Sequence, residues 1–247
     1  MPQYRWNIST HAEGYDAAAQ VIHPRYVEVQ DIVLAELANL RDRPGLIVDA
    51  GGGSGRLMQR ILTAHPNAQG MVVDQSEAFL ALAERRLEEF GDRAKCHVAR
   101  LQEDWLASLP DRPIAVVSMT AIHHLDAAEK QTLFQRIYDA LQTGGLFING
   151  DEVRPEDDEA YLDVLKECRA HKRKLVEDGL VPESMHQILR DWEQRNVTNF
   201  HAQRTSGDDC HETLERQLQW LSDCGFERAQ CVWHKQLWAV MVGAKKA

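Results

Sequence analysis

Two acidic residues flank a glycine-rich segment in the first third of the chain. Asp49 lies near the end of the apolar run LIVDA, and the glycines that follow are Gly51, Gly52, Gly53 and Gly55. Because glycine has no Cβ, such a segment can turn with positive φ and let a flat ligand lie against the main chain. Asp74 closes the next apolar run, where a carboxylate can accept hydrogen bonds from both hydroxyls of a ribose. Together these residues predict a nucleoside-binding site.

The spacing of the glycines distinguishes two classes of nucleoside-binding enzyme. The G-x-G-x-x-G pattern of dinucleotide-binding enzymes would need a glycine at Arg56 or at Ala50, depending on the register. The pattern D-x-G-x-G-x-G, by contrast, is complete from Asp49 to Gly55. An oxidoreductase that uses NAD or NADP is therefore a disfavoured alternative. A tight strand-to-helix turn that binds nothing is the purely structural alternative.

Short apolar runs alternate with segments of helical spacing through the middle of the chain. The runs at 46–50, 71–74, 96–99, 114–119 and 146–150 predict strands, and residues 56–64, 76–90 and 127–141 predict helices between them. This alternation predicts a parallel sheet wrapped by helices. Further helices are expected at 24–40, 156–178, 183–195 and 211–223, and a β-hairpin at 227–233 and 236–244.

The glycine motif and three further segments resemble the class I S-adenosylmethionine-dependent methyltransferases. Residues 118–125, SMTAIHHL, are similar to the segment that this family places beside the transferable methyl group. Residues 141–148, LQTGGLFI, and a closing hairpin after a Cys-Gly-Phe turn are also typical of it. The resemblance implies an α/β fold whose seven-stranded sheet is mostly parallel, with an antiparallel C-terminal hairpin and helices on both faces.

The same resemblance implies a division of the chain. Residues 1–43 are expected to form an N-terminal helical cap, and residues 44–247 a domain that binds S-adenosylmethionine. A helical insertion that acts as a lid is expected after the fifth strand, at about 155–200.

The resemblance also implies which residues bind S-adenosylmethionine. Asp49 would help to hold the methionine part and Asp74 the ribose. The implied set is Asp49, Gly51, Gly52, Gly53, Gly55, Asp74, Gln75, Leu101, Gln102, Ser118 and Met119. Many relatives carry Gly-Asp after the third strand where this chain has Arg100 and Leu101. Main-chain and apolar contact with adenine is therefore expected from Leu101, and the polar contact from Gln102, Glu103 or Asp104. Some similar tRNA-modifying enzymes use carboxy-S-adenosylmethionine, but Trp220 stands where its carboxylate would need an arginine, so the ordinary cofactor is expected.

The HHL sequence after the fourth predicted strand offers candidates for catalysis. Methyl transfer is an in-line displacement at an activated carbon, so the protein mainly aligns the reactants and excludes water. His123 and His124 stand where a base for the acceptor would be needed, with packing as the alternative role. Metal ligation by both histidines with Asp126, or by the cluster at 208–212, is a less favoured alternative, so no metal is expected.

The segments outside the shared architecture are candidates for binding the acceptor. Aromatic residues near the N-terminus, among them Tyr4 and Trp6, are expected to fold over the cofactor, because aromatic faces favour a sulfonium cation. The insertion is expected to set acceptor specificity. The candidate acceptor contacts are Tyr15, His11, His186, Trp192 and Arg204.

Composition narrows the remaining choices. The formal net charge of −10 disfavours a nucleic-acid partner. Five cysteines without a paired spacing predict a reduced protein, and the absence of an apolar leader or of a run of about 18 apolar residues predicts a cytoplasmic one without a membrane partner. We therefore expect an enzyme that methylates a small molecule. A homodimer is compatible with the sequence, and a non-catalytic binding partner on the same fold is the third alternative.

Overall fold

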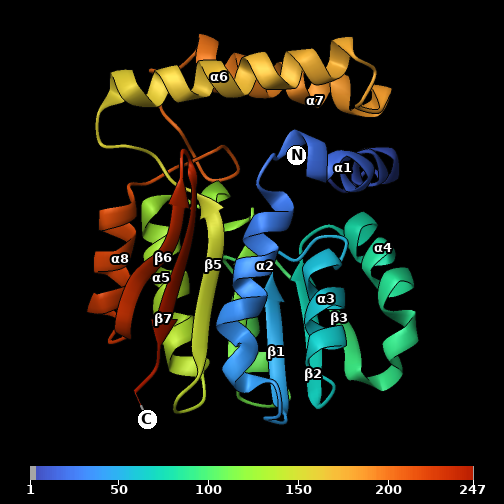
Figure 1. The fold of residues 1–247 in the computed structure, drawn as a ribbon, viewed down its shortest axis with the longest axis vertical. Coiled ribbons are helices and arrows are strands. Elements are labelled where there is room, and N and C mark those ends of the chain that lie inside the picture. The colour runs from blue at the N-terminus through green and yellow to red at the C-terminus, as the bar shows by residue number, and fades with distance from the viewer. Residues whose placement is uncertain (1–3, 247) are drawn as a thin grey trace.

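The computed structural model describes residues 4–246 as one seven-stranded sheet surrounded by helices (Figure 1). The strand order is β3-β2-β1-β4-β5-β7-β6. The strands are β1 (Gly45–Ala50), β2 (Ala68–Asp74), β3 (Ala94–Val98), β4 (Ala115–Met119), β5 (Leu146–Glu152), β6 (Glu227–Lys235) and β7 (Trp238–Ala244). Strands β1 to β5 pair in parallel, and β7 pairs antiparallel with both β5 and β6. The predicted sheet and its antiparallel C-terminal hairpin are thus confirmed.

Helices cover both faces of the sheet, and side chains that alternate along the strands fill the two layers. The helices α2 (Tyr26–Leu37), α3 (Arg56–Ala64) and α4 (Glu77–Leu87) pack on one face, and α5 (Ala127–Ala140) and α8 (Leu214–Asp223) pack on the other. On β1, Ile47 belongs to the first core and Val48 to the second. Within the described residues, no helix has the length and apolar character needed to cross a bilayer.

Side-chain caps fix where two of these helices begin. Ser76 caps α4 as predicted, because its Oγ accepts a hydrogen bond from the Phe79 backbone N–H at 3.1 Å. The helix is shorter than expected, because its last turn changes to the 3-10 segment Glu88–Arg93, in which Gly91 has a φ of +54°. Asp126 caps α5 in a reciprocal capping box with Glu129. This role commits Asp126 to its helix.

Three helices lie across the carboxyl ends of the strands (Figure 1). They are α1 (Ser9–Ile22), α6 (Asp158–Glu177) and α7 (Glu183–Glu193), and a π-helical turn, Gln194–Thr198, follows α7. Apolar residues such as Ile22, Leu175 and Met185 join them in a separate small core. Three further 3-10 segments, Ala38–Leu40, Trp105–Ser108 and Ile122–His124, complete the helical elements. The edge of the sheet where β1 to β5 end therefore lies beneath a helical cover.

Candidate functional site

A cavity of about 370 Å³ lies between the carboxyl ends of the strands and the helices above them. The strand order reverses direction around β1 and β4, and ligands of open α/β sheets bind in the crevice at such a switch point. The floor of the cavity contains residues from the ends of β1, β2 and β4, and its roof contains residues of α1, α6 and α7. The volume falls in the range of sites for small molecules.

The glycine-rich segment presents bare main chain to this cavity. Gly51, Gly52 and Gly53 line it, and the φ angles of Gly51 and Gly53 are +72° and +54°. A Cβ on Gly51 would come within 2.3 Å of the Ala121 Cβ, so no larger residue fits there. Gly55 has a φ of +75° but lies behind the segment, against Ala83 of α4. The tight turn with positive φ that the sequence predicted is therefore present, and its backbone lines the cavity.

Asp74 links the glycine-rich segment to the start of α4. Its Oδ2 accepts a hydrogen bond from the Gly53 N–H at 3.0 Å, and its Oδ1 accepts one from the Ser76 N–H at 2.8 Å. Burial raises the pKa of Asp74 to about 6, although these backbone N–H groups oppose the rise. Since Asp74 also lines the cavity, its carboxylate is placed to accept hydroxyl groups from a ligand there.

Asp49 carries a buried carboxyl group without a partner. The residue is fully buried, and neither carboxylate oxygen has a hydrogen-bond partner among residues 4–246. Burial raises the pKa of Asp49 to about 7, and the charge of Asp74 adds to the rise. A buried acid of this kind is costly unless a cation or a hydrogen-bond donor meets it. The amino group of a bound S-adenosylmethionine would meet that need.

The other predicted cofactor residues divide into two groups. Gln75, Leu101, Gln102 and Met119 line the cavity. Ser118 does not, because it is fully buried and its Oγ donates to the Ala50 carbonyl at 2.7 Å, which ties β4 to β1. Trp220, considered for the carboxylated cofactor, lies on α8, partly buried against the core, and does not line the cavity.

Aromatic residues from the N-terminal segment close one side of the cavity. The rings of Trp6 and Tyr15 meet edge to face with centroids 5.1 Å apart, and Trp6 also contacts Phe79 at 5.7 Å. Tyr4, Trp6 and Tyr15 all line the cavity, as expected for a cap of this type. His11 does not line it, and its Nδ1 bonds to the Arg5 carbonyl at 2.9 Å.

An ion-pair cluster that sequence inspection missed attaches the cap to the glycine-rich segment. Asp16 of α1 accepts hydrogen bonds from Ser54 at 2.5 Å, from Arg56 at 2.8 Å and from Arg86 at 2.8 Å. Burial favours a higher pKa for Asp16, but these three donors outweigh it and lower the pKa. The cap and the predicted cofactor segment are therefore held as one unit.

His123 lies at the end of the cavity beyond Met119, where β4 gives way to a 3-10 turn. Its backbone N–H donates to Asp151 Oδ2 at 2.9 Å, and its Nδ1 donates to Asp151 Oδ1 at 2.6 Å. Burial favours a lower pKa for His123, but the charge and hydrogen bond of Asp151 outweigh it and raise the pKa to about 9. Asp151 thus holds the backbone and the ring of His123 by one hydrogen bond each, and Nε2 takes part in neither. That atom lies 3.9 Å from Asp209 Oδ1.

His124 and Asp209 complete this end of the cavity. His124 Nδ1 lies 3.3 Å from Asp209 Oδ1, and both residues line the cavity. Burial lowers the pKa of His124, and the neighbouring His123 lowers it further. Burial favours a higher pKa for Asp209, but the hydrogen bond from His124 and the surrounding histidines hold it well below the usual value. The sequence placed Asp209 only within an acidic cluster.

A second group of buried polar residues lies beside the first. Glu152, at the end of β5, contacts His211 Nε2 at 3.1 Å and His23 Nδ1 at 3.6 Å. The Tyr161 hydroxyl bonds to His211 Nδ1 at 2.5 Å, and the Tyr15 hydroxyl to His23 Nε2 at 3.1 Å. No local motif marks these residues, because four separate segments supply them.

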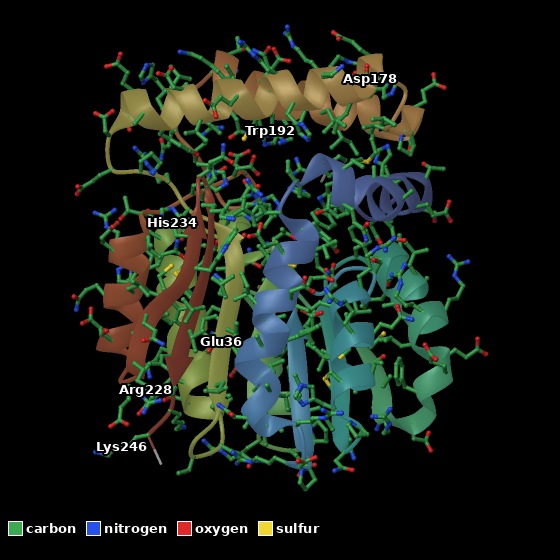
Figure 2. All side chains as sticks on the ribbon, in the orientation of Figure 1. Glu36, Asp178, Trp192, Arg228, His234 and Lys246 are labelled. Atoms are coloured by element: carbon green, nitrogen blue, oxygen red, sulfur yellow. The ribbon has the colours of Figure 1, made fainter. Side chains whose placement is uncertain are left out.

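The predicted acceptor contacts are brought to the cavity only in part. Tyr15 and Trp192 line it, and Figure 2 shows Trp192 on the side of the insertion that faces the sheet. His186 faces a second hollow between α6 and α7, where its Nε2 bonds to the Val181 carbonyl at 3.2 Å. Arg204 lies on the loop after α7, outside the cavity lining.

Two basic residues of the insertion are further candidate contacts for the acceptor. Lys172 and Arg195 line the cavity. Lys172 Nζ lies 3.9 Å from the centre of the Trp192 ring, a cation–π contact. Lys172 belongs to the basic cluster of residues 169–174, whose charge was the available signal in the sequence.

Comparison with known proteins identifies the fold that carries this cavity. Residues 47–145 match the family model described as "Methyltransferase domain". The chain has the fold of the class I methyltransferases. The match covers both predicted nucleoside acids and the histidine turn, and it favours a methyltransferase over a nicotinamide-dependent oxidoreductase.

Relatives agree with the domain match. The chain is 23% identical over 179 residues to the carboxy-S-adenosyl-L-methionine synthase of Nautilia profundicola, which covers 67% of this chain and 75% of that protein. An O-methyltransferase family protein from Burkholderia thailandensis superposes with a TM-score of 0.61 at 15% identity, covering 93% of this chain and 58% of that one. Human N-acetylserotonin methyltransferase in complex with S-adenosylmethionine superposes with a TM-score of 0.56 at 16% identity, covering 94% of this chain and 58% of that one. The chain thus spans less than two thirds of the length of these two solved proteins.

Proposed function

We propose that this protein transfers the methyl group of S-adenosylmethionine to a small-molecule acceptor by in-line displacement. One observation supports this most directly. A single cavity is lined by a glycine-rich wall, by the two predicted nucleoside acids and by two histidines, of which His123 is buried and His124 is partly exposed. A donor and an acceptor held at the two ends would meet inside a closed volume, where orientation lowers the barrier and water is excluded.

The two ends of the cavity are assigned different tasks. S-adenosylmethionine supplies a methyl carbon on a positively charged sulfur, and that bond breaks as a lone pair of the acceptor attacks the carbon. Asp49 would hold the amino group of the methionine part and Asp74 the ribose hydroxyls. His123 and His124 would act on the acceptor, because both line the cavity from the 3-10 turn that follows β4.

Several features favour a small acceptor over a macromolecule. Helices α1, α6 and α7 cover the cavity, so a polymer would have to displace them (Figure 1). The charge of −10 also opposes a polyphosphate partner. Lys172 and Arg195 in the wall would suit an acceptor that carries an acidic group. The five cysteines are free thiols, which suits the reducing cytoplasm where we place the protein.

Ligand binding tests the proposal before any acceptor is known. We expect S-adenosylhomocysteine to raise the melting temperature of the purified protein, with no effect of NAD or NADP at the same concentration. Incubation with a metabolite extract and methyl-labelled cofactor should then give a labelled product of low mass. Stabilisation by NAD in place of S-adenosylhomocysteine would refute the assignment, and binding without transfer to any extract would favour a non-catalytic partner.

Substitution of His123 tests the division of tasks. We expect His123→Gln to reduce turnover by roughly 10²–10⁴-fold, the range for loss of a group that assists proton transfer. The affinity for S-adenosylhomocysteine, measured by calorimetry, should change little. Equal turnover in variant and wild type would assign His123 to packing.

The assembly state can be measured directly. We propose that the protein is a homodimer. Light scattering after gel filtration should then give twice the mass of the 247-residue chain.

A further inference from the structure

Two imidazoles and one carboxylate converge at the acceptor end of the cavity. His123 and His124 come from the turn after β4, and Asp209 comes from the loop between α7 and α8. One potential ligand atom from each lies within 4.8 Å of the others. Two histidines with one carboxylate are a donor set that suits divalent transition metals such as Fe²⁺, Co²⁺ and Zn²⁺. We propose that His123, His124 and Asp209 form a mononuclear site for such an ion.

His123 and Asp209 each make a second hydrogen bond of the kind that orients metal ligands. A histidine that binds a metal usually donates its other ring N–H to a carboxylate, which fixes the orientation of the ring. His123 does this through Nδ1 to Asp151 at 2.6 Å, so Nε2 remains as the donor atom. Asp209 Oδ2 accepts a hydrogen bond from the Asn196 amide at 2.6 Å, and its Oδ1 faces His124 Nδ1 at 3.3 Å. His124 Nδ1 also lies 3.2 Å from the Asp208 carbonyl oxygen, so an ion bound here would replace these His124 contacts. His123 Nε2 and Asp209 Oδ1 lie 3.9 Å apart.

The backbone holds the loop of Asp209 against the histidine turn. The Gly207 N–H donates to the His124 carbonyl at 2.8 Å, and the Cys210 N–H donates to the His123 carbonyl at 2.8 Å. These bonds lie on either side of Asp209 in the chain. The three side chains are therefore brought together by the fold itself, which lowers the cost of ordering them when an ion binds.

The charge balance at this point also favours a cation. Asp209 is only 5% exposed, and within residues 4–246 it forms ion pairs with histidines but with no lysine or arginine. Asp208, its neighbour, is instead the partner of Arg195 at 3.9 Å. The Arg5 guanidinium interacts with Asp209 through its charge but forms no ion pair with it. A buried carboxylate whose ion pairs are to imidazoles gains from a divalent ion between them.

Three protein ligands leave coordination positions for a further molecule. All three residues line the cavity, so those positions face the space assigned to the acceptor. The metal would accept an oxygen donor there, such as a hydroxyl, an enol or a carboxylate of the acceptor. A divalent ion would lower the pKa of a bound hydroxyl and make it a stronger nucleophile at neutral pH. Binding of the acceptor to the metal rests on the proposed function, whereas the metal site itself does not.

Titration with Co²⁺ tests the site, because the visible absorption of bound Co²⁺ reports its coordination. The protein, stripped with a chelator and dialysed, would be titrated as wild type and as His124→Gln and Asp209→Asn. The control is His234→Gln, since His234 is exposed on β6 and lies away from the cavity (Figure 2). We expect one Co²⁺ per chain in the wild type and in the control. Both site variants should bind at least about tenfold more weakly.

A parallel titration with S-adenosylhomocysteine separates the metal site from the proposed function. Each variant should keep the cofactor affinity of the wild type within about threefold, which also shows that it is folded. Wild-type protein that binds S-adenosylhomocysteine but no Co²⁺ would overturn the metal site alone. So would Co²⁺ binding that Asp209→Asn leaves unchanged. Protein that binds Co²⁺ in this pattern but no S-adenosylhomocysteine would leave the metal site standing and remove the methyltransferase proposal.

Discussion

Replacement of Asp74 by asparagine is the sharpest test of the cofactor site. The carboxylate accepts from the backbone N–H groups of Gly53 and Ser76, at 3.0 and 2.8 Å, and would also accept the ribose hydroxyls. Asparagine has one acceptor oxygen, so its NH₂ must face one of these N–H donors. The variant should therefore lose a charged acceptor and distort the wall of the cavity while keeping the shape of the side chain.

The size of the effect follows from the bonds involved. Hydrogen bonds to charged groups contribute about 1.5–3 kcal/mol each to stability or binding. We expect Asp74→Asn to weaken S-adenosylhomocysteine binding by about this amount, or roughly 10- to 150-fold in dissociation constant. Isothermal titration calorimetry at pH 7.5 measures the loss. Asp92→Asn is the matched control, because it removes the same charge from an exposed site outside the cavity.

The pH dependence gives the same prediction a second measurement. Burial raises the pKa of Asp74 from its usual value of 3.8 to about 6. Between these values the folded protein binds more protons than the unfolded chain, so this group makes the free protein less stable as pH rises. Ligand binding needs the ionised form, so affinity should fall by roughly tenfold per pH unit below about 6. Asp74→Asn should remove that contribution.

The refuting outcomes are specific. A dissociation constant of Asp74→Asn within twofold of the wild type at pH 7.5 would exclude Asp74 from the site. An equal loss in Asp92→Asn would show that net charge, and not the contact, sets the affinity. Thermal unfolding of both variants without ligand identifies a loss that comes from misfolding.

Three further substitutions probe the surrounding structure. Gly51→Ala should destabilise the protein by about 1–3 kcal/mol in urea unfolding, because alanine is strained at a φ of +72° and meets Ala121; unchanged stability would refute the tight turn. Asp49→Asn should raise the stability of the ligand-free protein by about 1–3 kcal/mol, because it removes a buried carboxyl without a partner. The same variant should bind the cofactor more weakly. A variant that is less stable and also binds more weakly would contradict this prediction. Asp16→Asn should cost about 1–3 kcal/mol at neutral pH. Because the folded pKa of Asp16 is depressed, its contribution is present above about pH 3.8 and is lost as pH falls through the folded pKa, so wild type and variant should converge in acid.

The cofactor end of the cavity could be predicted because its determinants are local. Asp49 and the glycines occupy seven consecutive positions, and Asp74 ends the next strand. In a parallel sheet the carboxyl ends of neighbouring strands meet at one edge, so a strand pattern is enough to bring these residues together. A strand pattern does not specify which side chains reach the cavity. Ser118 of β4 was expected there, but its hydroxyl bonds to the Ala50 carbonyl inside the sheet.

The acceptor end could be predicted only in part. His123 and His124 were visible as a motif, but the metal alternatives paired them with Asp126 or kept the 208–212 cluster apart. Asp126 is committed to the start of α5, and the chain instead returns Asp209 to the histidines from beyond the insertion. Among the expected acceptor contacts, His186 and Arg204 lie away from the cavity, and Lys172 and Arg195 line it. The side of an exposed helix that faces a cavity depends on how the helix docks.

The amino-acid sequence by itself determined the strands, the open turn between them and the acids that flank it, because backbone sterics and apolar periodicity act over a few residues. Only the tertiary structure decided which side chains meet His123. Asp151 lies 28 positions along the chain, and Asp209 follows after two more helices. Contacts over such separations depend on the path of the loops across the edge of the sheet, which local preferences do not specify.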